Sequence, residues 1–205
     1  AKRMDHVQPM FQVLQAARPL PDHVAIVRDN MARGRAARLA GEWPEIMAAG
    51  RHLLDGAAVP DGALGQRLAF LAEADRLKTV IRASRLIDGS RRENSAEHSW
   101  HVALCALVLA PLAERGVDPG RVIRMLLIHD LVEIDVGDVP LHSAGGTAHD
   151  APAVKAAEAA AARRIFGLLP AAEGAALLAL WQEFEAGATP DARFARGLDR
   201  FQPAL

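Results

Sequence analysis

The chain has 205 residues, of which 51% are hydrophobic and 24% are charged. This length and composition allow one sizeable buried core and exclude a disordered tail. The formal net charge is −1, from 24 basic and 25 acidic residues. Because nucleic-acid binders carry a strong positive balance, no nucleic-acid partner is expected. The single cysteine, Cys105, excludes an internal disulfide framework and a zinc site built from cysteines.

The sequence contains no signal for membrane insertion or secretion. No apolar run reaches the roughly 18–20 residues that a membrane-spanning helix needs, so no membrane partner is expected. Lys2 and Arg3 are followed by a mixed segment rather than by the apolar stretch of a signal peptide. We therefore expect a cytoplasmic protein.

The composition predicts an all-α fold. Aromatic residues make up 4% of the chain and tyrosine is absent, whereas alanine and leucine, both good helix formers, are abundant. Apolar spacing and capping residues predict helices in chain order at 1–17 (broken by Pro9), 22–33, 42–54, 63–82, 96–115, 121–135, 152–168, 172–186 and 190–203. Asp22 and Thr189 are the expected caps, Gly56–Gly62 the expected linker, and Gly137–Asp150 a long loop.

The two ends of the chain share a pattern. Residues 1–11 read AKRMDHVQPMF and residues 195–205 read ARGLDRFQPAL, so that Ala, Asp, Gln and Pro recur at the same spacing. Chance similarity is one explanation, and a truncated tandem repeat or a permuted arrangement is the other. We expect a helical segment over residues 1–60 and a body over residues 61–205. If the first segment packs on the body of a second copy, the protein is a homodimer.

The segment VIRMLLIHDLVE at 122–133 carries the main chemical signal. His129 and Asp130 lie within an apolar helix, and Glu133 follows at helical spacing from both. A buried carboxylate must be paired, hydrogen-bonded or bound to a metal, because an unpaired one costs several kcal/mol. Three titratable side chains on one face of such a helix indicate a functional site, the alternative being a helix end that turns to solvent.

Two further segments contain candidate ligands. His98 and His101 begin the apolar helix expected at 96–115, and the residues alone allow either histidine as a metal ligand. Asp199 has the apolar neighbours Leu198 and Phe201. By itself it could equally be a helix aspartate paired with an arginine.

In order, these residues form the pattern H…HD…D, and the chain resembles the HD-domain metal-dependent phosphohydrolases, in particular the branch with the 5′-deoxynucleotidases. The likeness rests on residues 77–82, 88–101, 125–138 and 194–203 and runs from about Leu64 to Leu205. It implies a helical bundle with a buried metal site. Residues 28–43, with the pattern RDNMARG…EW, are similar to the tail that follows this bundle in the family, so the segment over 1–60 resembles a family tail placed before its body, as a tandem or permuted copy. The implied metal ligands are His98, His129, Asp130 and Asp199. It further implies that Glu133 and Asp138 are catalytic and that phosphate contacts Arg82, Arg91 and Arg92.

The resemblance implies an enzyme that removes phosphate from a small phosphorylated substrate, such as a nucleoside 5′-monophosphate. The alternatives are a phosphodiesterase or another nucleotide phosphohydrolase, and a metal- or nucleotide-binding regulatory module without turnover. Two imidazoles and two carboxylates suit Mn²⁺, Fe²⁺, Co²⁺, Zn²⁺ or Mg²⁺. A divalent ion is therefore the expected cofactor, and the sequence does not choose among these metals.

Overall fold

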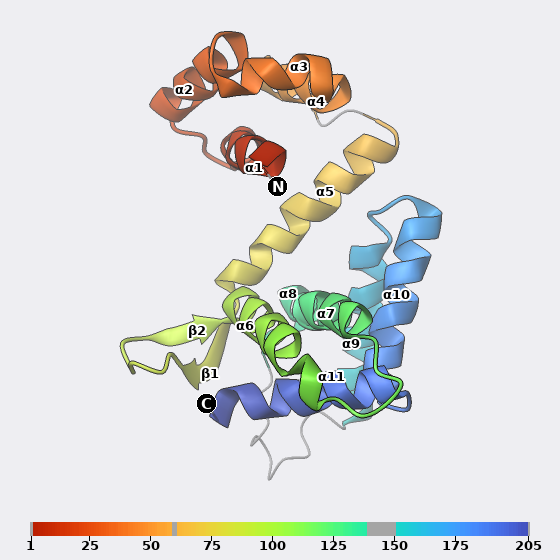
Figure 1. The fold of residues 1–205 in the computed structure, drawn as a ribbon. Helices are drawn as coiled ribbons and strands as arrows, with labels where there is room; N and C mark the ends of the chain where they lie inside the picture. Colours follow the sequence, from red (N-terminus) through yellow and green to blue (C-terminus); the bar gives the residue numbers. More distant parts are fainter. Residues whose placement is uncertain (1, 59–60, 139–150, 205) are drawn as a thin grey trace. The chain divides into compact units, whose positions relative to one another are not determined.

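The computed structural model describes residues 2–58, 61–138 and 151–204. The chain divides into two compact units, an N-terminal unit of residues 1–72 and a C-terminal unit of residues 73–205. Helices dominate both units, and the described residues contain one two-stranded sheet besides them (Figure 1). The all-α fold class is therefore confirmed. No helix of the described ranges is long and apolar enough to cross a membrane.

The N-terminal unit consists of short helices around an apolar core. Its elements are α1 (Lys2–Leu14), α2 (Pro21–Ala32), η1 (Arg35–Arg38), α3 (Leu39–Glu42), α4 (Pro44–Leu54) and the greater part of α5 (Ala63–Asp75). The core joins side chains from each of these elements: Val7, Met10, Phe11, Val27, Met31, Ala36, Leu39, Ile46, Met47, Ala49 and Leu68.

Two sequence predictions fail in this unit. The expected break at Pro9 is absent, because α1 continues through this residue. Pro9 is exposed and removes one backbone donor, whereas Val7, Met10 and Phe11 anchor the helix in the core on both sides of it. Asp22 is not the cap of α2, since that helix begins one residue earlier at Pro21, whose fixed φ suits a first turn.

The C-terminal unit contains a β-hairpin followed by a helical bundle. Its elements are η2 (Arg76–Thr79), β1 (Ile81–Arg85), β2 (Arg92–Asn94), α6 (Ser95–Leu109), η3 (Ala110–Leu112), α7 (Pro119–Ile128), η4 (His129–Val132), α8 (Glu133–Val136), α9 (Pro152–Phe166), α10 (Ala171–Ala186), α11 (Pro190–Phe201) and η7 (Gln202–Ala204). The antiparallel strands pair Ile81 with Asn94 and Arg85 with Arg92.

The helix expected over 63–82 is wrong at its C-terminal end. The observed helix α5 ends at Asp75, and the chain continues through η2 into the strand β1. Val80 and Ile81 are β-branched, which weakens the helix. The Val80 carbonyl also accepts a hydrogen bond from the Ser95 amide at 3.0 Å, so pairing with a distant segment decides the extended conformation.

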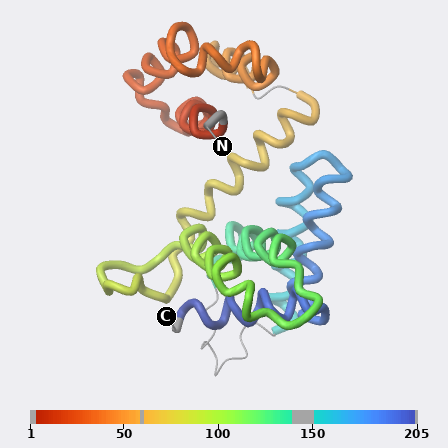
Figure 2. Tube along the Cα trace, viewed as in Figure 1, coloured from red at the N-terminus to blue at the C-terminus, as the bar shows by residue number. Residues whose placement is uncertain are grey.

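The bundle core lies among α6, α7, α10 and α11, and Cys105 is one of its buried residues. In Figure 2 the green segment of α6 and α7 runs beside the blue C-terminal helix α11, which contacts both helices. Thr189 caps α11 as expected, because its hydroxyl accepts from the Ala192 amide. Asn94 and Glu97 form a reciprocal capping box at the start of α6.

The helix expected over 121–135 is divided into α7, η4 and α8. The tighter 3₁₀ segment contains the His129–Asp130 pair, so these side chains leave the backbone where the regular helix is interrupted. The loop expected over Gly137–Asp150 lies outside the described residues from 139 onward.

Candidate metal centre

Three side chains from two elements converge in the C-terminal unit. His98 comes from α6, and His129 and Asp130 come from η4. Each offers a ligand atom, and these atoms lie within 4.8 Å of one another, the one such group found among the described residues. The side chain of His98 has no exposed surface and that of His129 is 2% exposed. The bundle therefore brings segments about thirty residues apart in the chain to one buried point.

Both imidazole rings are held from outside the cluster. The Nδ1 atom of His129 lies 2.8 Å from the Leu126 carbonyl oxygen, and that of His98 lies 2.8 Å from Gln202 Oε1. Carbonyl oxygens only accept, so each Nδ1 carries the hydrogen in a neutral ring. Each Nε2 then holds a lone pair directed into the cluster, which is the arrangement of metal-binding histidines.

Two carboxylates face these lone pairs. Asp130 Oδ1 lies 3.0 Å from His129 Nε2. Asp199 Oδ1 lies 2.9 Å from His98 Nε2 and 3.4 Å from His129 Nε2. The structure thus adds Asp199, from α11, to the group of three. It brings together all four residues that the resemblance implies as ligands.

The electrostatics of this cluster favour a cation. Burial lowers the pKa of His129, but the negative charges of Asp130 and Asp199 outweigh this effect and raise it to about 9. Burial likewise opposes ionisation of Asp199, yet the two histidines hold the pKa of its carboxyl well below the usual range. His129 Nε2 is buried and has no partner in hydrogen-bond geometry. Two imidazoles and two carboxylates with such an orphaned nitrogen fit a divalent metal ion.

Arg82 places a positive charge beside the cluster. Its guanidinium donates to Asp130 Oδ2 at 3.1 Å and lies 3.4, 3.7 and 3.6 Å from carboxylate oxygens of Glu93, Glu133 and Asp138. Burial lowers its pKa, but the charges of Asp130, Glu133, Asp138 and Asp199 raise it overall. Arg82 therefore stays charged and offsets part of the negative charge around the site.

Glu133 and Asp138 lie beside Arg82 in different settings. Glu133 is 9% exposed, and burial, followed by the charge of Asp130, raises the pKa of its carboxyl to about 9. Asp138 Oδ2 accepts from the Ala83 amide at 3.3 Å and so ties β1 to the end of α8. Glu133 thus has the environment of a proton-transfer group, whereas Asp138 holds the hairpin against the site.

The other residues named from the sequence lie away from the cluster. Arg91 and Arg92 are exposed on the hairpin, where Arg91 forms a two-bond ion pair with Glu97. Among the described residues, Gln202 connects His101 to the cluster, since its amide nitrogen lies 2.9 Å from His101 Nδ1. The structure therefore brings His98 to the cluster and not His101.

Sequence reasoning missed three residues that surround the histidines. Glu93 pairs with Arg82, Gln202 accepts from His98, and Trp181 donates its indole hydrogen to the His129 carbonyl at 3.2 Å. The repeated Gln-Pro at the two chain ends was a signal for Gln202. Glu93 and Trp181 have no local signal, because their partners are distant in the chain.

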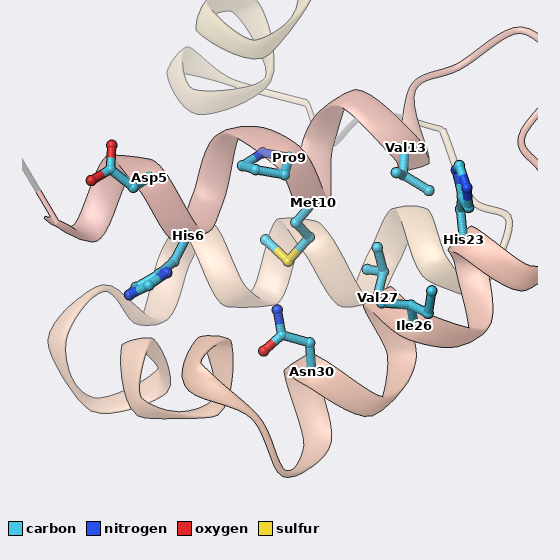
Figure 3. Close-up of a pocket in the computed structure, with 9 residues that line it drawn as sticks. All are labelled: Asp5, His6, Pro9, Met10, Val13, His23, Ile26, Val27 and Asn30. Atoms are coloured by element: carbon cyan, nitrogen blue, oxygen red, sulfur yellow. The ribbon is translucent and has the colours of Figure 1, made fainter.

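Asp5, the counterpart of Asp199 in the repeated pattern, has different surroundings. It lines a cavity of about 280 Å³ between α1 and α2 together with His6, His23 and Asn30. Figure 3 shows Asp5 and His6 pointing in different directions from α1. Within the described ranges, no group of three or more ligand residues includes Asp5.

Comparison with protein-family models finds a match to the HD domain over residues 74–205. The chain is also similar to a crystal structure described as a predicted metal-dependent phosphohydrolase from Magnetospirillum magnetotacticum MS-1. The two share 52% sequence identity at a TM-score of 0.63, over 69% of this chain and 68% of the other.

Two curated relatives are similar at lower identity. 5′-Deoxynucleotidase HDDC2 of Homo sapiens is 28% identical over 141 residues, which are 67% of this chain and 65% of the relative. A 5′-deoxynucleotidase of Pasteurella multocida is 35% identical over 105 residues, 49% of this chain and 53% of the relative. The chain thus spans slightly less than two thirds of the human relative and about half of the bacterial one.

Proposed function

This chain is a member of the HD domain family, and from that premise we propose that it is a metal-dependent phosphohydrolase acting on a nucleoside 5′-monophosphate. The observation that carries the proposal is the convergence of two imidazole Nε2 atoms with the carboxylates of Asp130 and Asp199. Relatives named 5′-deoxynucleotidase support the choice of substrate class.

The proposed ligands are His98, His129, Asp130 and Asp199. When bound, a divalent ion supplies polarisation of a phosphoryl oxygen and makes water a stronger acid. Arg82 balances the phosphate charge through its planar guanidinium, which suits forked hydrogen bonds to phosphate oxygens. Arg91 and Arg92, on the exposed hairpin, contact the outer part of the substrate.

Glu133 takes the proton of the attacking water and returns it to the leaving oxygen. Burial and neighbouring carboxylates raise the pKa of Glu133 to about 9 without a metal, and the positive charge of a bound ion would lower it toward neutrality, where the group can both accept and release a proton. Asp138 keeps β1, and with it Arg82, in place against the site through its bond to the Ala83 amide. The phosphoester bond breaks and inorganic phosphate is released.

The experiment that tests this function uses the full chain purified without chelator. Metal content is measured first, and phosphate release is then measured on nucleoside 5′-monophosphates, their deoxy forms, 3′-monophosphates and a phosphodiester. Release from 5′-monophosphates supports the proposal. Cleavage of the diester alone favours a phosphodiesterase, and binding of metal and nucleotide without turnover favours a regulatory module. A protein that binds no divalent metal contradicts all three.

A matched pair of variants shows whether the metal depends on the cluster. Asp130 and Asp191 are both aspartates with 9% exposure in the same unit, but Asp191 accepts from the Asp118 amide and pairs with Arg121 rather than with a histidine. Asp130→Asn is expected to lose most of its bound metal, because a charged ligand is removed. Asp191→Asn is expected to keep it. Equal metal content in the two variants would argue against the site.

Four finer features belong to the same proposal. The metal is one of Mn²⁺, Fe²⁺, Co²⁺, Zn²⁺ and Mg²⁺, the protein is cytoplasmic, and it forms a homodimer. Residues 1–60 are a family tail segment that precedes its body at 61–205. The repeated pattern at the two chain ends supports this tail assignment. Light scattering of the full chain in solution tests the dimer.

A further inference from the structure

Gln202 contacts three side chains of the polar network around the cluster, namely His98, His101 and Glu93. It lies in η7, one turn after Asp199, and is 8% exposed. Its Oε1 lies 2.8 Å from His98 Nδ1, while its Nε2 lies 2.9 Å from His101 Nδ1 and 3.5 Å from Glu93 Oε2. The last turn of one helix thus supplies both a proposed ligand and an amide that contacts another ligand.

Glu93 fixes the direction in which this amide points. Its Oε1 lies 3.4 Å from Arg82 Nε, and the oxygens of a carboxylate that pairs with a guanidinium accept hydrogen bonds. The Gln202 NH₂ group must therefore face Glu93 and His101, and its carbonyl oxygen must face His98. A flipped amide would put its oxygen against the Glu93 carboxylate, where neither group can donate a hydrogen bond.

The amide direction in turn decides the tautomer of His98. With a carbonyl oxygen at 2.8 Å, Nδ1 must carry a hydrogen, so Nε2 is the nitrogen that is left to bind a metal ion beside Asp199. His129 has the same arrangement, but there the acceptor is the backbone carbonyl of Leu126. One histidine is therefore oriented by the main chain, and the other by a side chain that a single substitution removes.

We propose that Gln202 is the positioning residue that holds His98 in the Nδ1–H tautomer and thereby sets the affinity of the site for its metal. The proposal rests on the proposed function, since it assumes that the cluster binds a divalent ion. Removing a partner that orients a metal ligand typically weakens metal binding by about 10–100-fold.

The first test reads the tautomer of His98 in the metal-free full chain. Long-range ¹H–¹⁵N spectra of protein with labelled histidines distinguish the two tautomers, and a His98→Gln variant assigns the signals. We expect a hydrogen on His98 Nδ1 in the wild type, whether or not Nε2 also donates to Asp199, and its loss in Gln202→Met, which keeps the length of the side chain without an acceptor. A wild-type His98 in the Nε2–H form would overturn the proposal, whether or not the protein binds metal.

The second test measures the dissociation constant for Mn²⁺ by calorimetry. Gln202→Met is expected to weaken Mn²⁺ binding by about 10–100-fold, whereas Gln202→Glu, which restores an acceptor for Nδ1, is expected to bind more tightly than Gln202→Met. Gln8→Met is the matched control, because Gln8 holds the same place in the repeated pattern and bonds only to the exposed Gln12 in the described contacts.

The outcomes separate this inference from the proposed function. If the wild type binds no Mn²⁺, Co²⁺ or Zn²⁺, the metal site itself fails, and the tautomer spectrum still tests the role of Gln202. If the wild type binds Mn²⁺ and Gln202→Met binds it equally well, the metal site stands and the positioning role is wrong. Equal loss in Gln202→Met and Gln202→Glu would also contradict the role, because it would show a packing defect rather than a lost acceptor. Unfolding of both variants by heat confirms that each is folded at the assay temperature.

Discussion

The same short pattern is used in one unit and unused in the other. In α11 and η7, Asp199 and Gln202 contact opposite nitrogens of His98. In α1, their counterparts Asp5 and Gln8 are exposed, and Gln8 donates to its helix neighbour Gln12. The comparison teaches that an Asp-x-x-Gln turn becomes part of a site only where other elements bring histidines to it.

The two hydrophobic cores differ in the same way. All buried polar and charged residues of the described ranges lie in the C-terminal unit. They are Arg82, Glu93, Ser95, His98, Ser99, His129, Asp130, Glu133, Asp191 and Gln202. The core cluster of the N-terminal unit is apolar. Buried polar groups are costly unless they are paired, so their concentration in one unit marks that unit as the place of the chemistry.

The sharpest test of this contrast replaces the two equivalent aspartates. Asp199→Ala is expected to remove most of the bound metal and all measurable turnover, because it deletes a charged ligand 2.9 Å from His98 Nε2. Asp5→Ala is expected to change neither. Elemental analysis and phosphate release on both purified variants check this, and metal loss in Asp5→Ala would show that the N-terminal unit has a site of its own.

The second prediction concerns proton transfer. Among the described residues, buried carboxyl groups occur in the C-terminal unit and not in the N-terminal unit. In Glu133→Gln the shape is kept and the proton acceptor is lost, so turnover should fall by about 10²–10⁴-fold while metal stays bound. The exposed Glu45→Gln in α4 serves as the control. Full activity in Glu133→Gln, measured at saturating metal, would make Glu133 a structural residue.

The third prediction compares how much the packing of equivalent side chains in α11 and α1 contributes to stability. Leu198 is 5% exposed, whereas Met4, its counterpart, is 50% exposed. We expect Leu198→Ala to lower the free energy of unfolding of the C-terminal unit by about 2–5 kcal/mol. Met4→Ala should stay within about 0.5 kcal/mol of the wild type. Hydrogen exchange under urea resolves the two units, and similar costs for both variants would mean that Met4 is buried against something in solution.

The smallest expected effect depends on pH. The Arg91 guanidinium and the Asn94 amide lower the pKa of Glu97 from 4.5 to about 2, so ionised Glu97 stabilises the start of α6. This contribution is present above about pH 4.5 and is lost as the pH falls toward 2. Glu97→Gln should therefore be less stable than the wild type at pH 7, and the gap should shrink at pH 3.5. In urea unfolding, a gap of constant size would contradict this role of Glu97.

Local sequence determined much of what the structure contains. Alanine- and leucine-rich periodicity predicted the helices, and Thr189 predicted the start of α11, because helix geometry and capping depend on near neighbours. The family resemblance, which rests on the ordered His, His-Asp and Asp segments, predicted four metal ligands. These residues, His98, His129, Asp130 and Asp199, lie together in the structure. The residues alone did not decide whether His98 or His101 is the ligand, since both lie on the same face of one helix.

Tertiary structure alone decided the remaining features. The strand at Ile81–Arg85 exists because Val80 and Ser95 join across a turn, although the local pattern continues a helix. Glu93, Gln202 and Trp181 take their roles from partners far along the chain, for which periodicity holds no information. Asp5 and Asp199 share a local pattern, but only Asp199 meets two buried histidines. The physical reason is common to all of these cases: the charge and hydrogen-bonding state of a buried group depends on what the packed chain places within a few ångströms of it.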